Sequence, residues 1–534
     1  MGYKIGIDFG TTNSTVSYVN SSNELKTFRY PSIEAYEYIP SCVAYETDGS
    51  ISIGRSALTL AGIPGVTFCN NLKMILPLLQ SDRAKYGWSS GNEPEKVISD
   101  YFTCLLHSDD DSSSFREQMG EIEGIVLSVP HVWAKGMNHV GRERLQTIIT
   151  DAMKLPLIQL ISEPVAAAAY YAYRHQQDSS KTFQGNILIC DMGGGTFDVT
   201  LCKVEPGKVE ELHNDGNGRS GLGKAGVCFD RRLILERCKG KGNNIDENSP
   251  EFFELYNKLQ EYKAYNHGKI TKNIINAIEE PDFMKNTILI AGRMSFDFLN
   301  IQKAFEEIKS GIIEVLQRFK SAIDQKGYSV DAIFFVGGFA QFYFVRETIK
   351  KFWDIGQNDP RFMERIDKEI SRYAISYGAA LVANGIMSVE EKYEHTIGVE
   401  AWKLIRAEGE GEEFTKKTIK IPIIKGGKKL SEYENVQFAE CLVKAHNESP
   451  EIVIYIDPDS KDRIVKQKLS ESLDIKVPNA GIPGNKWKVG MRINKSKVVY
   501  LVLEDSKGKR VEYELGDILR QMFGGLEIIH GEEN

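Results

Sequence analysis

The sequence lacks the patterns that mark several large protein classes. Its 534 residues contain no apolar run near the roughly 18 residues that span a bilayer, so we expect no membrane span. The net charge is −8 and no basic stripe is present, which argues against nucleic acid as a partner. The first residues show no signal-peptide pattern. The eight cysteines form no C-x-x-C pair, so we expect reduced thiols in a cytoplasmic protein.

What remains is the composition of an ordinary globular protein. Hydrophobic residues make up 42% of the chain and charged residues 26%, which is enough apolar material for sizeable cores. The length predicts about three or four domain-sized units.

One short pattern occurs twice, first over 5–13 and again over 187–198. Each copy is an apolar run that ends in aspartate, followed by a glycine- and threonine-rich turn and a second alternating run. Such runs predict a buried strand and a hairpin. Glycines let backbone N–H groups approach an anion, and threonine hydroxyls add donors. We therefore predict two phosphate-binding turns, formed by Gly10, Thr11, Thr12 and Asn13 and by Gly193, Gly194, Gly195 and Thr196.

The aspartate at the end of each first run has a different role. Asp8 and Asp191 are negative and cannot bind a phosphate directly. An acidic side chain at a strand end suits a hydrated Mg²⁺ that accompanies the phosphates. We predict that both aspartates hold this ion through water.

The repetition extends beyond the turns. A strand-like run over 125–130 follows the first turn, and another over 333–338 follows the second, each beside strongly helical sequence. A hairpin, a long insert, a strand and a helix, present twice, predict two similar lobes that face each other. A nucleotide between them would meet one hairpin from each lobe.

Five pieces in this order resemble the actin-like ATPase superfamily: the first turn, the Val129-Pro130 strand, the block Glu163–Ala168, the second turn, and Val336-Gly337-Gly338. The second turn and the Glu163-Pro164 block are most similar to the seventy-kilodalton heat-shock chaperone family. Phe339, directly after Gly338, resembles the divergent heat-shock protein family A member-twelve branch. The resemblance covers 1–387 well. It implies an α/β fold with two actin-like ATPase lobes, duplicated ribonuclease-H-like units, followed by a β-rich C-terminal domain.

The resemblance also implies a ligand and a site. The ligand is ATP or ADP with Mg²⁺, and the catalytic set is Asp8, Lys73, Glu163, Asp191 and Thr196. Lys73 would reach toward the γ-phosphate and Glu163 would lie near the metal and its water. The alternatives are a surface lysine and a glutamate that only opens a helix. Asp198 either fixes the second hairpin for function or is purely structural.

Further contacts would come from three places in the second lobe. The resemblance places Gly226 near a phosphate, and Gly337, Gly338 and Phe339 beside the adenosine. The family has serine and arginine where this chain has Phe339 and Gln341, so stacking by an arginine is in doubt and Phe339 is a candidate replacement. Glu261 and Lys263 are candidates to flank the base, against the alternative of a solvated helix face.

The resemblance and the change of pattern after Met387 divide the chain. We predict lobe I over 1–185, lobe II over 186–358, a return helix over 359–387, a linker over 388–394, a β-sandwich-like domain over 395–515, and a short helix with a tail over 516–534. The family's apolar linker and helical lid are not recognisable in this sequence.

Together these patterns predict a chaperone-like weak ATPase whose nucleotide state controls polypeptide binding by the β-domain. Its partners would be unfolded or specific client polypeptides and co-chaperones. A sugar or polyol kinase of the same fold, or a nucleotide-dependent scaffold with little hydrolysis, remain as alternatives.

Overall fold

A computed structural model describes most of the chain in two compact units. The described residues are 2–31, 36–78, 83, 88, 93–107, 113–134, 139–217, 225–240, 242, 245–247, 249–356, 359–362, 373–406, 414–443, 451–460, 462–478, 482, 486–516, 518, 519 and 522. The first unit comprises 1–132, 148–157 and 161–389, and the second comprises 133–147, 158–160 and 390–534.

The first lobe of the first unit is built on a six-stranded sheet. Its order is β3-β2-β1-β8-β9, with β4 also paired to β2. Strands β1 and β2 form an antiparallel hairpin, and β8 runs parallel to β1. The strands are β1 (Tyr3–Phe9), β2 (Asn13–Val19), β3 (Leu25–Thr27), β4 (Ile39–Pro40), β8 (Ile122–Val129) and β9 (Leu157–Ser162).

A smaller sheet and short helices complete lobe I. The three-stranded sheet has the order β6-β5-β7. These elements are β5 (Val43–Tyr45), β6 (Ile51–Ile53), β7 (Thr67–Cys69), α1 (Gly54–Leu60), α2 (Leu72–Ile75), α4 (Pro94–Phe102) and α5 (Phe115–Met119).

The second lobe repeats the arrangement of the first. Its five-stranded sheet has the order β15-β10-β11-β12-β16. Strands β10 and β11 form an antiparallel hairpin, and β15 runs parallel to β10. The predicted duplication is therefore present in the sheet topology as well as in the sequence. The strands are β10 (Gly185–Met192), β11 (Phe197–Glu205), β12 (Lys208–Gly216), β15 (Ala332–Val336) and β16 (Ser388–Glu390).

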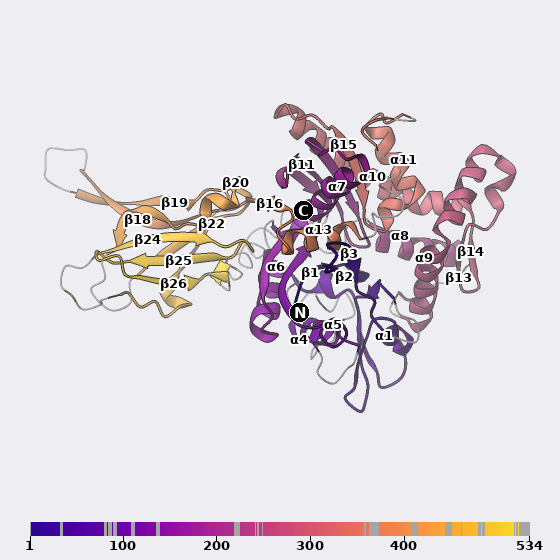
Figure 1. The fold of residues 1–534 in the computed structure, drawn as a ribbon, viewed down its shortest axis with the longest axis horizontal. Helices are drawn as coiled ribbons and strands as arrows, with labels where there is room; N and C mark the ends of the chain where they lie inside the picture. Colours follow the sequence, from indigo (N-terminus) through magenta and orange to yellow (C-terminus); the bar gives the residue numbers. More distant parts are fainter. Residues whose placement is uncertain are drawn as a thin grey trace. The chain divides into compact units, whose positions relative to one another are not determined.

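Two helices rich in small residues lie between the two sheets (Figure 1). They are α7 (Glu163–Ser179) and α13 (Ala374–Ala383). A Cβ at Gly378 on α13 would overlap the backbone of Ala166 on α7, and a Cβ at Gly6 on β1 would overlap the α13 backbone. Glycine and alanine at these contacts let the backbones approach closely, so both sheets share one continuous core.

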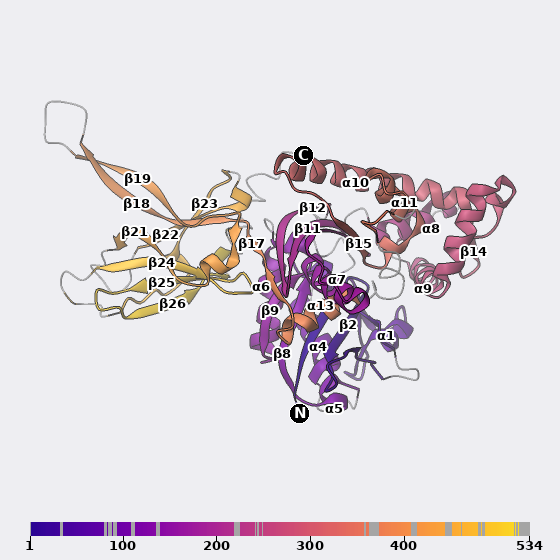
Figure 2. The same cartoon turned by 45° about the horizontal axis from the view of Figure 1, so that its top comes forward.

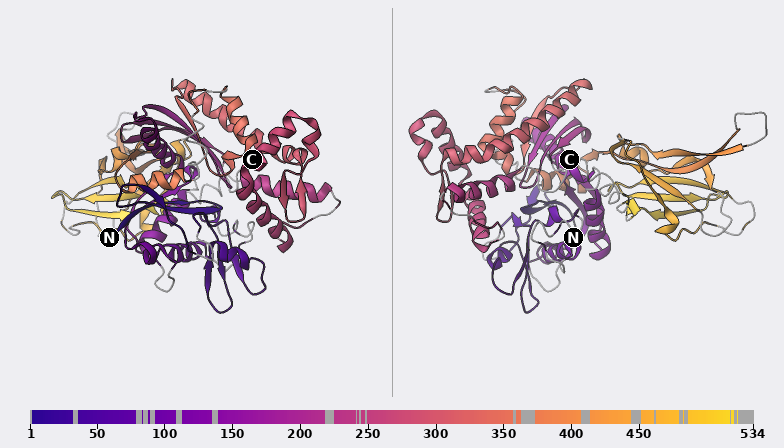
Figure 3. Two further views of the ribbon diagram at one scale, coloured as in Figure 1. Left: turned by 45° about the vertical axis from the view of Figure 1, so that its right-hand side comes forward. Right: turned by 180° about the vertical axis from the view of Figure 1, so that it is seen from behind.

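Longer helices cover lobe II on its other face, as Figure 3 shows from two sides. Among them, the amphipathic helix α10 buries Phe305, Ile312 and Phe319 against the sheet, and Asp297 caps its N-terminus in a reciprocal pair with Asn300. The apolar residues of this helix recur every three or four positions and form one buried face. These elements are α8 (Gly226–Gly240), α9 (Pro250–Glu279), β13 (Leu289–Ala291), β14 (Met294–Phe296), α10 (Phe298–Gln325) and α11 (Tyr343–Phe352).

The second unit contains two four-stranded antiparallel sheets (Figure 2). Their orders are β19-β18-β22-β23 and β21-β24-β25-β26. Both sheets supply residues to one apolar core, which includes Val399, Ile454, Trp487 and Leu501. The strands are β18 (Thr396–Arg406), β19 (Phe414–Ile424), β21 (Gln437–Val443), β22 (Val453–Asp457), β23 (Val465–Lys468), β24 (Trp487–Ile493), β25 (Val499–Glu504) and β26 (Arg510–Glu514).

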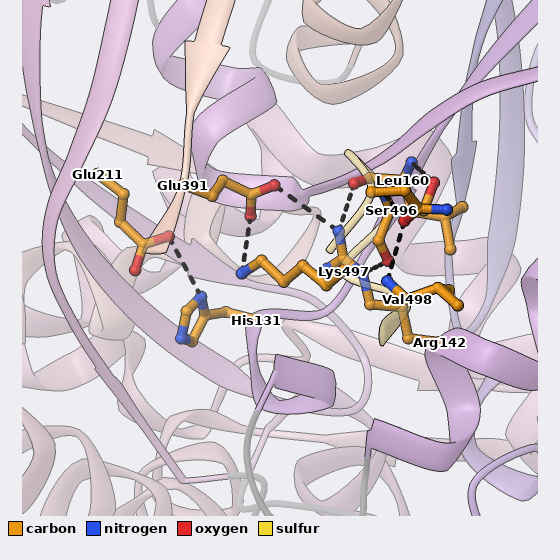
Figure 4. A network of polar contacts seen from close by, with 9 residues as sticks. His131, Arg142, Leu160, Glu211, Glu391, Ser496, Lys497 and Val498 are labelled. Carbon is orange, nitrogen blue, oxygen red and sulfur yellow. Dashed lines mark hydrogen bonds and ion pairs between the residues drawn. The ribbon is translucent and has the colours of Figure 1, made fainter. Parts of the chain in front are cut away.

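The second unit also contains a buried ionic network (Figure 4). Arg142 of helix α6 (His139–Thr147) is 1% exposed. Its Nε donates to the carbonyl of Ser496 at 3.0 Å, and its Nη2 donates to the carbonyl of Leu160. Glu391 lies 3.7 Å from Arg142 and 3.5 Å from the ammonium of Lys497. The carboxylate therefore has two cationic neighbours in an environment that excludes water.

The predicted domain boundaries stay predictions, but the structure shows strands inside the predicted linker. Residues 388–394 include β16 and β17 (Lys392–Tyr393), which pairs with β20 (Lys428–Lys429), so this stretch carries strands as well as connecting residues. The helix and tail expected over 516–534 fall mostly outside the described residues. Within the described part of the chain, no helix combines the length and apolarity that a membrane crossing needs.

The Arg142 network gives a stability prediction with an internal control. Arg142→Ala removes one of the two cations that lie beside the buried carboxylate of Glu391, and breaking a buried pair typically costs about 3–5 kcal/mol. Arg492→Ala removes the ion pair with Glu512 on the same unit, which is more exposed and worth about 1 kcal/mol or less. Urea unfolding followed through hydrogen exchange of β24 and β25 measures both. Equal effects of the two substitutions would contradict a structural role for the buried network.

Candidate functional site

The first aspartate of the predicted site lies at the end of β1. Asp8 is opposite Ser128 in the parallel pairing with β8, and the Ser128 hydroxyl donates to Asp8 Oδ1 at 3.2 Å. On its other side Asp8 is opposite Thr15 of β2. Pairing on both sides fixes where the carboxylate lies.

Asp191 has the equivalent position at the end of β10. It is opposite Val336 of the parallel strand β15, and its side chain is 6% exposed. Its Oδ2 has no hydrogen-bond partner among the described residues. Gly337 follows with a φ of +83°, and a Cβ there would lie 2.7 Å from Asp191 Oδ1. Glycine is therefore required for the chain to pass this carboxylate.

The structure brings the two predicted phosphate turns together. A Cβ at Gly194 would lie 2.8 Å from Thr12 Oγ1, and a Cβ at Gly195 would lie 3.0 Å from Thr11 Oγ1. Residues from hairpins that are far apart in the sequence thus face each other at contact distance. The absence of side chains at both glycines is what lets the threonine hydroxyls enter this space.

An ion pair lies beside the turns. Lys73 on α2 and Glu163 at the start of α7 form a direct salt bridge, and they are 4% and 7% exposed. The sequence left a surface lysine and a helix-opening glutamate as alternatives. Both side chains are instead buried against each other, so neither has the solvated position that the first alternative requires.

The charges of this group are not balanced. Four carboxylates, Asp8, Glu163, Asp191 and Asp198, interact electrostatically, and Lys73 is the cation among them. Burial, and after it the negative charge of Glu163, raise the pKa of Asp8 to about 7 against the opposing effects of Lys73 and Ser128. Burial, then Glu163, Asp198 and Asp8, hold the pKa of Asp191 well above its usual range.

This donor set fits a divalent cation. Carboxylate oxygens with excess negative charge are the ligands that Mg²⁺ prefers, and the ion often keeps its own waters. The unpartnered Oδ2 of Asp191 is a buried acceptor that needs a partner. Asp8 and Asp191 are therefore the residues that would hold such an ion, directly or through water.

Backbone and side-chain hydrogen bonds within lobe II hold the second turn in place. The amides of Gly226 and Val227, at the N-terminus of α8, donate to the carbonyls of Gly193 and Gly194 at 3.2 and 2.8 Å. The Thr196 hydroxyl donates to Asp198 Oδ2 at 2.9 Å. Asp198 therefore fixes the hairpin.

Phe339 is packed into the core of lobe II. Its ring is 7% exposed, stacks on Phe342 with ring centroids 5.3 Å apart, and contacts Phe229 at 5.2 Å. Gly226 lies against the same ring. These contacts occupy much of the ring surface, so stacking of a base on Phe339 remains a prediction that this packing does not favour.

A polar cluster lies beside Phe339, and of its members only Lys263 was a candidate from the sequence. Lys263 Nζ lies 2.6 Å from both carboxylate oxygens of Asp230, which is fully buried on α8, and Gln260 donates to the same carboxylate. Lys263 also lies over the Phe339 ring at 5.6 Å. Glu261, the other sequence candidate, is exposed. The spacing of three residues between Gln260 and Lys263, which places both on one helix face, was the signal available in the sequence.

A further polar contact joins the lobes. His131, which follows β8, lies 3.9 Å from Glu211 on β12, and both side chains are buried (Figure 4). Helix α13 is in turn held to the first sheet by the hydroxyl of Ser376, which lies 2.8 Å from that of Ser17 on β2. The lobes are therefore also connected away from the turns.

Comparison with known proteins identifies relatives that carry the same name. Two curated relatives are the chaperone protein DnaK of Thermosipho melanesiensis and that of Thermosipho africanus, each 23% identical, over 401 and 397 residues. Each alignment covers 73% of this chain and 60% of the relative, so the chain spans about 60% of the length of the curated relatives it matches.

The family profile described as Hsp70 protein matches residues 117–416, which is more than half of the chain. The match runs from β8 through the second phosphate turn and lobe II into β18 and β19. Together with the two-lobed α/β architecture and the β-rich region that follows it, this shows that the chain belongs to the Hsp70 family.

Proposed function

We propose that this chain is a nucleotide-dependent chaperone. It binds ATP with Mg²⁺ between the two lobes, hydrolyses it slowly, and uses the nucleotide state to control polypeptide binding by the β-rich unit. The observation that carries the proposal is the pair of glycine-threonine turns that face each other beside an excess of buried carboxylates. A polyphosphate with a divalent cation complements both features.

The residues of the chain have distinct parts in this proposal. The turn N–H groups and the hydroxyls of Thr11 and Thr12 bind the β- and γ-phosphates. Lys73, oriented by Glu163, adds positive charge toward the γ-phosphate. A bound Mg²⁺ would neutralise phosphate charge. Asp8, with a pKa of about 7, can accept a proton from the attacking water near neutral pH.

Two finer assignments belong to the same proposal. The sequence Gly338-Phe339 supports placement in the divergent heat-shock protein family A member-twelve branch, since phenylalanine stands where the usual family members have serine. All eight cysteines are free thiols, which supports a reducing compartment such as the cytoplasm. Co-chaperones and client polypeptides are the proposed partners.

Substitution of Asp191 tests the cation site. Asp191→Asn removes a charge that the cation complements, so we expect single-turnover ATP hydrolysis to slow by about 100-fold, a loss comparable to removal of one transition-state stabilising group. Asp282→Asn changes an exposed carboxylate of the same lobe and should leave the rate unchanged. Wild-type turnover by the Asp191 variant would remove the cation assignment.

The pKa of Asp8 predicts a pH dependence. The carboxylate is protonated below about pH 7 in the free protein, so Mg²⁺-dependent ATP affinity should fall as pH decreases from 8 to 6. Asp8→Asn should give a shallower profile in titration calorimetry, because the Asp8 contribution is removed while Asp191, whose pKa is also raised, remains. The contribution of Asp8 to the free energy of unfolding depends on pH in the opposite direction. Because the pKa is raised in the fold, this contribution is fully present below about pH 4 in the nucleotide-free protein and is lost as pH rises through about 7.

Polypeptide binding is tested separately from nucleotide binding. We expect an unfolded, fluorescently labelled peptide to dissociate at least several-fold faster from the ATP-bound full chain than from the ADP-bound full chain. The same preparation should turn over ATP at an unchanged rate when sugars or polyols are added. Stoichiometric phosphorylation of a sugar would instead establish the kinase alternative, and equal peptide dissociation rates would support a scaffold.

A further inference from the structure

One residue, Ser41, supports the first phosphate turn through its backbone and its side chain. Ser41 follows strand β4 and is 2% exposed. Its backbone N–H donates to the carbonyl of Thr12 at 2.9 Å, and its hydroxyl donates to the carbonyl of Gly10 at 2.8 Å. The Ser14 hydroxyl lies 2.9 Å from the Ser41 hydroxyl. Ser41 therefore contacts two carbonyl groups of the turn and the first residues of β2.

These two hydrogen bonds determine which way the turn amides face. A trans peptide unit is planar, and its C=O and N–H groups point in opposite directions. Because the carbonyls of Gly10 and Thr12 point toward Ser41, the N–H groups of Thr11 and Asn13 point away from it. Two amide donors of the turn are thus oriented by a residue on the opposite side of the backbone.

The turn has little freedom to find this orientation by another route. A Cβ at Gly10 would overlap the carbonyl oxygen of Asn13, so the backbone is already tightly folded there. On the far side, the hydroxyls of Thr11 and Thr12 contact the positions of Gly195 and Gly194 in the second lobe. The turn therefore lies between Ser41 behind and the second lobe in front.

The second lobe supports its turn in a different way. There the carbonyls of Gly193 and Gly194 accept hydrogen bonds from the backbone amides of Gly226 and Val227. Backbone donors are present whatever the side chain, whereas the bond to Gly10 depends on a hydroxyl group. A single substitution can therefore disturb the first turn and leave the second unchanged.

We propose that Ser41 is a positioning residue for the phosphates of the bound nucleotide. It does not touch the ligand; it holds the carbonyls of Gly10 and Thr12 so that the turn amides are oriented to bind phosphate. The inference rests on the proposed function, because it assigns a role within the same nucleotide site.

Ser41→Ala provides the test, and Ser17→Ala is its matched control. Ser17 is also fully buried, lies on the same hairpin, and pairs its hydroxyl with that of Ser376 at 2.8 Å, away from the turn. Each substitution deletes one buried hydroxyl and leaves a serine partner behind. Thermal unfolding of both variants confirms that they fold comparably before ligand binding is compared.

The expected result is selective for phosphate. With the full-length chain and Mg²⁺, Ser41→Ala should weaken ATP and ADP binding by about tenfold, the loss expected for about one misoriented hydrogen bond to a charged group. Adenosine, which lacks phosphates, should bind both proteins equally. Ser17→Ala should bind ATP within about twofold of wild type, and Ser41→Thr, which keeps the hydroxyl, should restore most of the affinity.

Three results would overturn the inference: unchanged ATP binding by Ser41→Ala, an equal loss for adenosine and ATP, or the same loss in Ser17→Ala. If Ser41→Ala fails to fold, Ser41→Val takes its place, because valine also lacks the hydroxyl group. Wild-type ATP affinity in Ser41→Val would also overturn the inference. If wild-type protein does not bind MgATP, the proposed function fails and the inference with it. Wild-type binding with an unaffected Ser41→Ala rejects the inference alone.

Discussion

The site depends on electrostatic repulsion between carboxylates that the fold holds close together. Asp8 and Asp191 lie at the ends of equivalent strands in two facing lobes, and Glu163 and Asp198 add to their negative potential. Lys73 offsets part of this charge through its buried pair with Glu163. In water such charges would be screened, but in a buried environment their repulsion is much larger. Under the proposed function, a cation accompanied by phosphates would relieve this repulsion.

Duplication explains how two distant segments form one site. Both lobes place an aspartate beside a hairpin turn and next to a parallel strand, so the two turns are related by the same topology. Their supports nevertheless differ. The first turn depends on the hydroxyl of Ser41, and the second depends on the amides at the start of α8. The second turn is therefore linked to the start of α8, while the first is supported within lobe I.

The second unit is stabilised by a combination of apolar and ionic interactions. Its two sheets share an apolar core around Trp487, and a buried carboxylate, Glu391, is contacted by Arg142 and Lys497. Burying these charges is costly unless each is paired, so the network constrains the geometry of the residues that form it more than it adds net stability. An apolar core tolerates small shifts in packing, whereas this arrangement of donors and acceptors specifies one geometry.

Much of the architecture could be predicted from the sequence because its signals are local. The repeated strand-aspartate-turn pattern predicts both hairpins, and the spacing of apolar residues by three or four from Phe305 to Ile323 is that of the amphipathic helix α10. Small residues in α7 and α13 agreed with their central position between the sheets. The strands within 388–394 were missed because short edge strands are specified by their partners, here β12 and β20, and carry little pattern of their own.

The sequence by itself determined which residues have the chemistry for a phosphate and metal site, since glycine, threonine and aspartate at fixed spacing already define the turns. Only the tertiary structure decided which of these groups act together and how they are held. It brought Gly194 to Thr12, paired Lys73 with Glu163, packed Phe339 against other aromatic rings of lobe II, and placed Ser41 behind the first turn. These are contacts between residues far apart in the chain, and their energies come from burial and hydrogen bonding that no local pattern encodes.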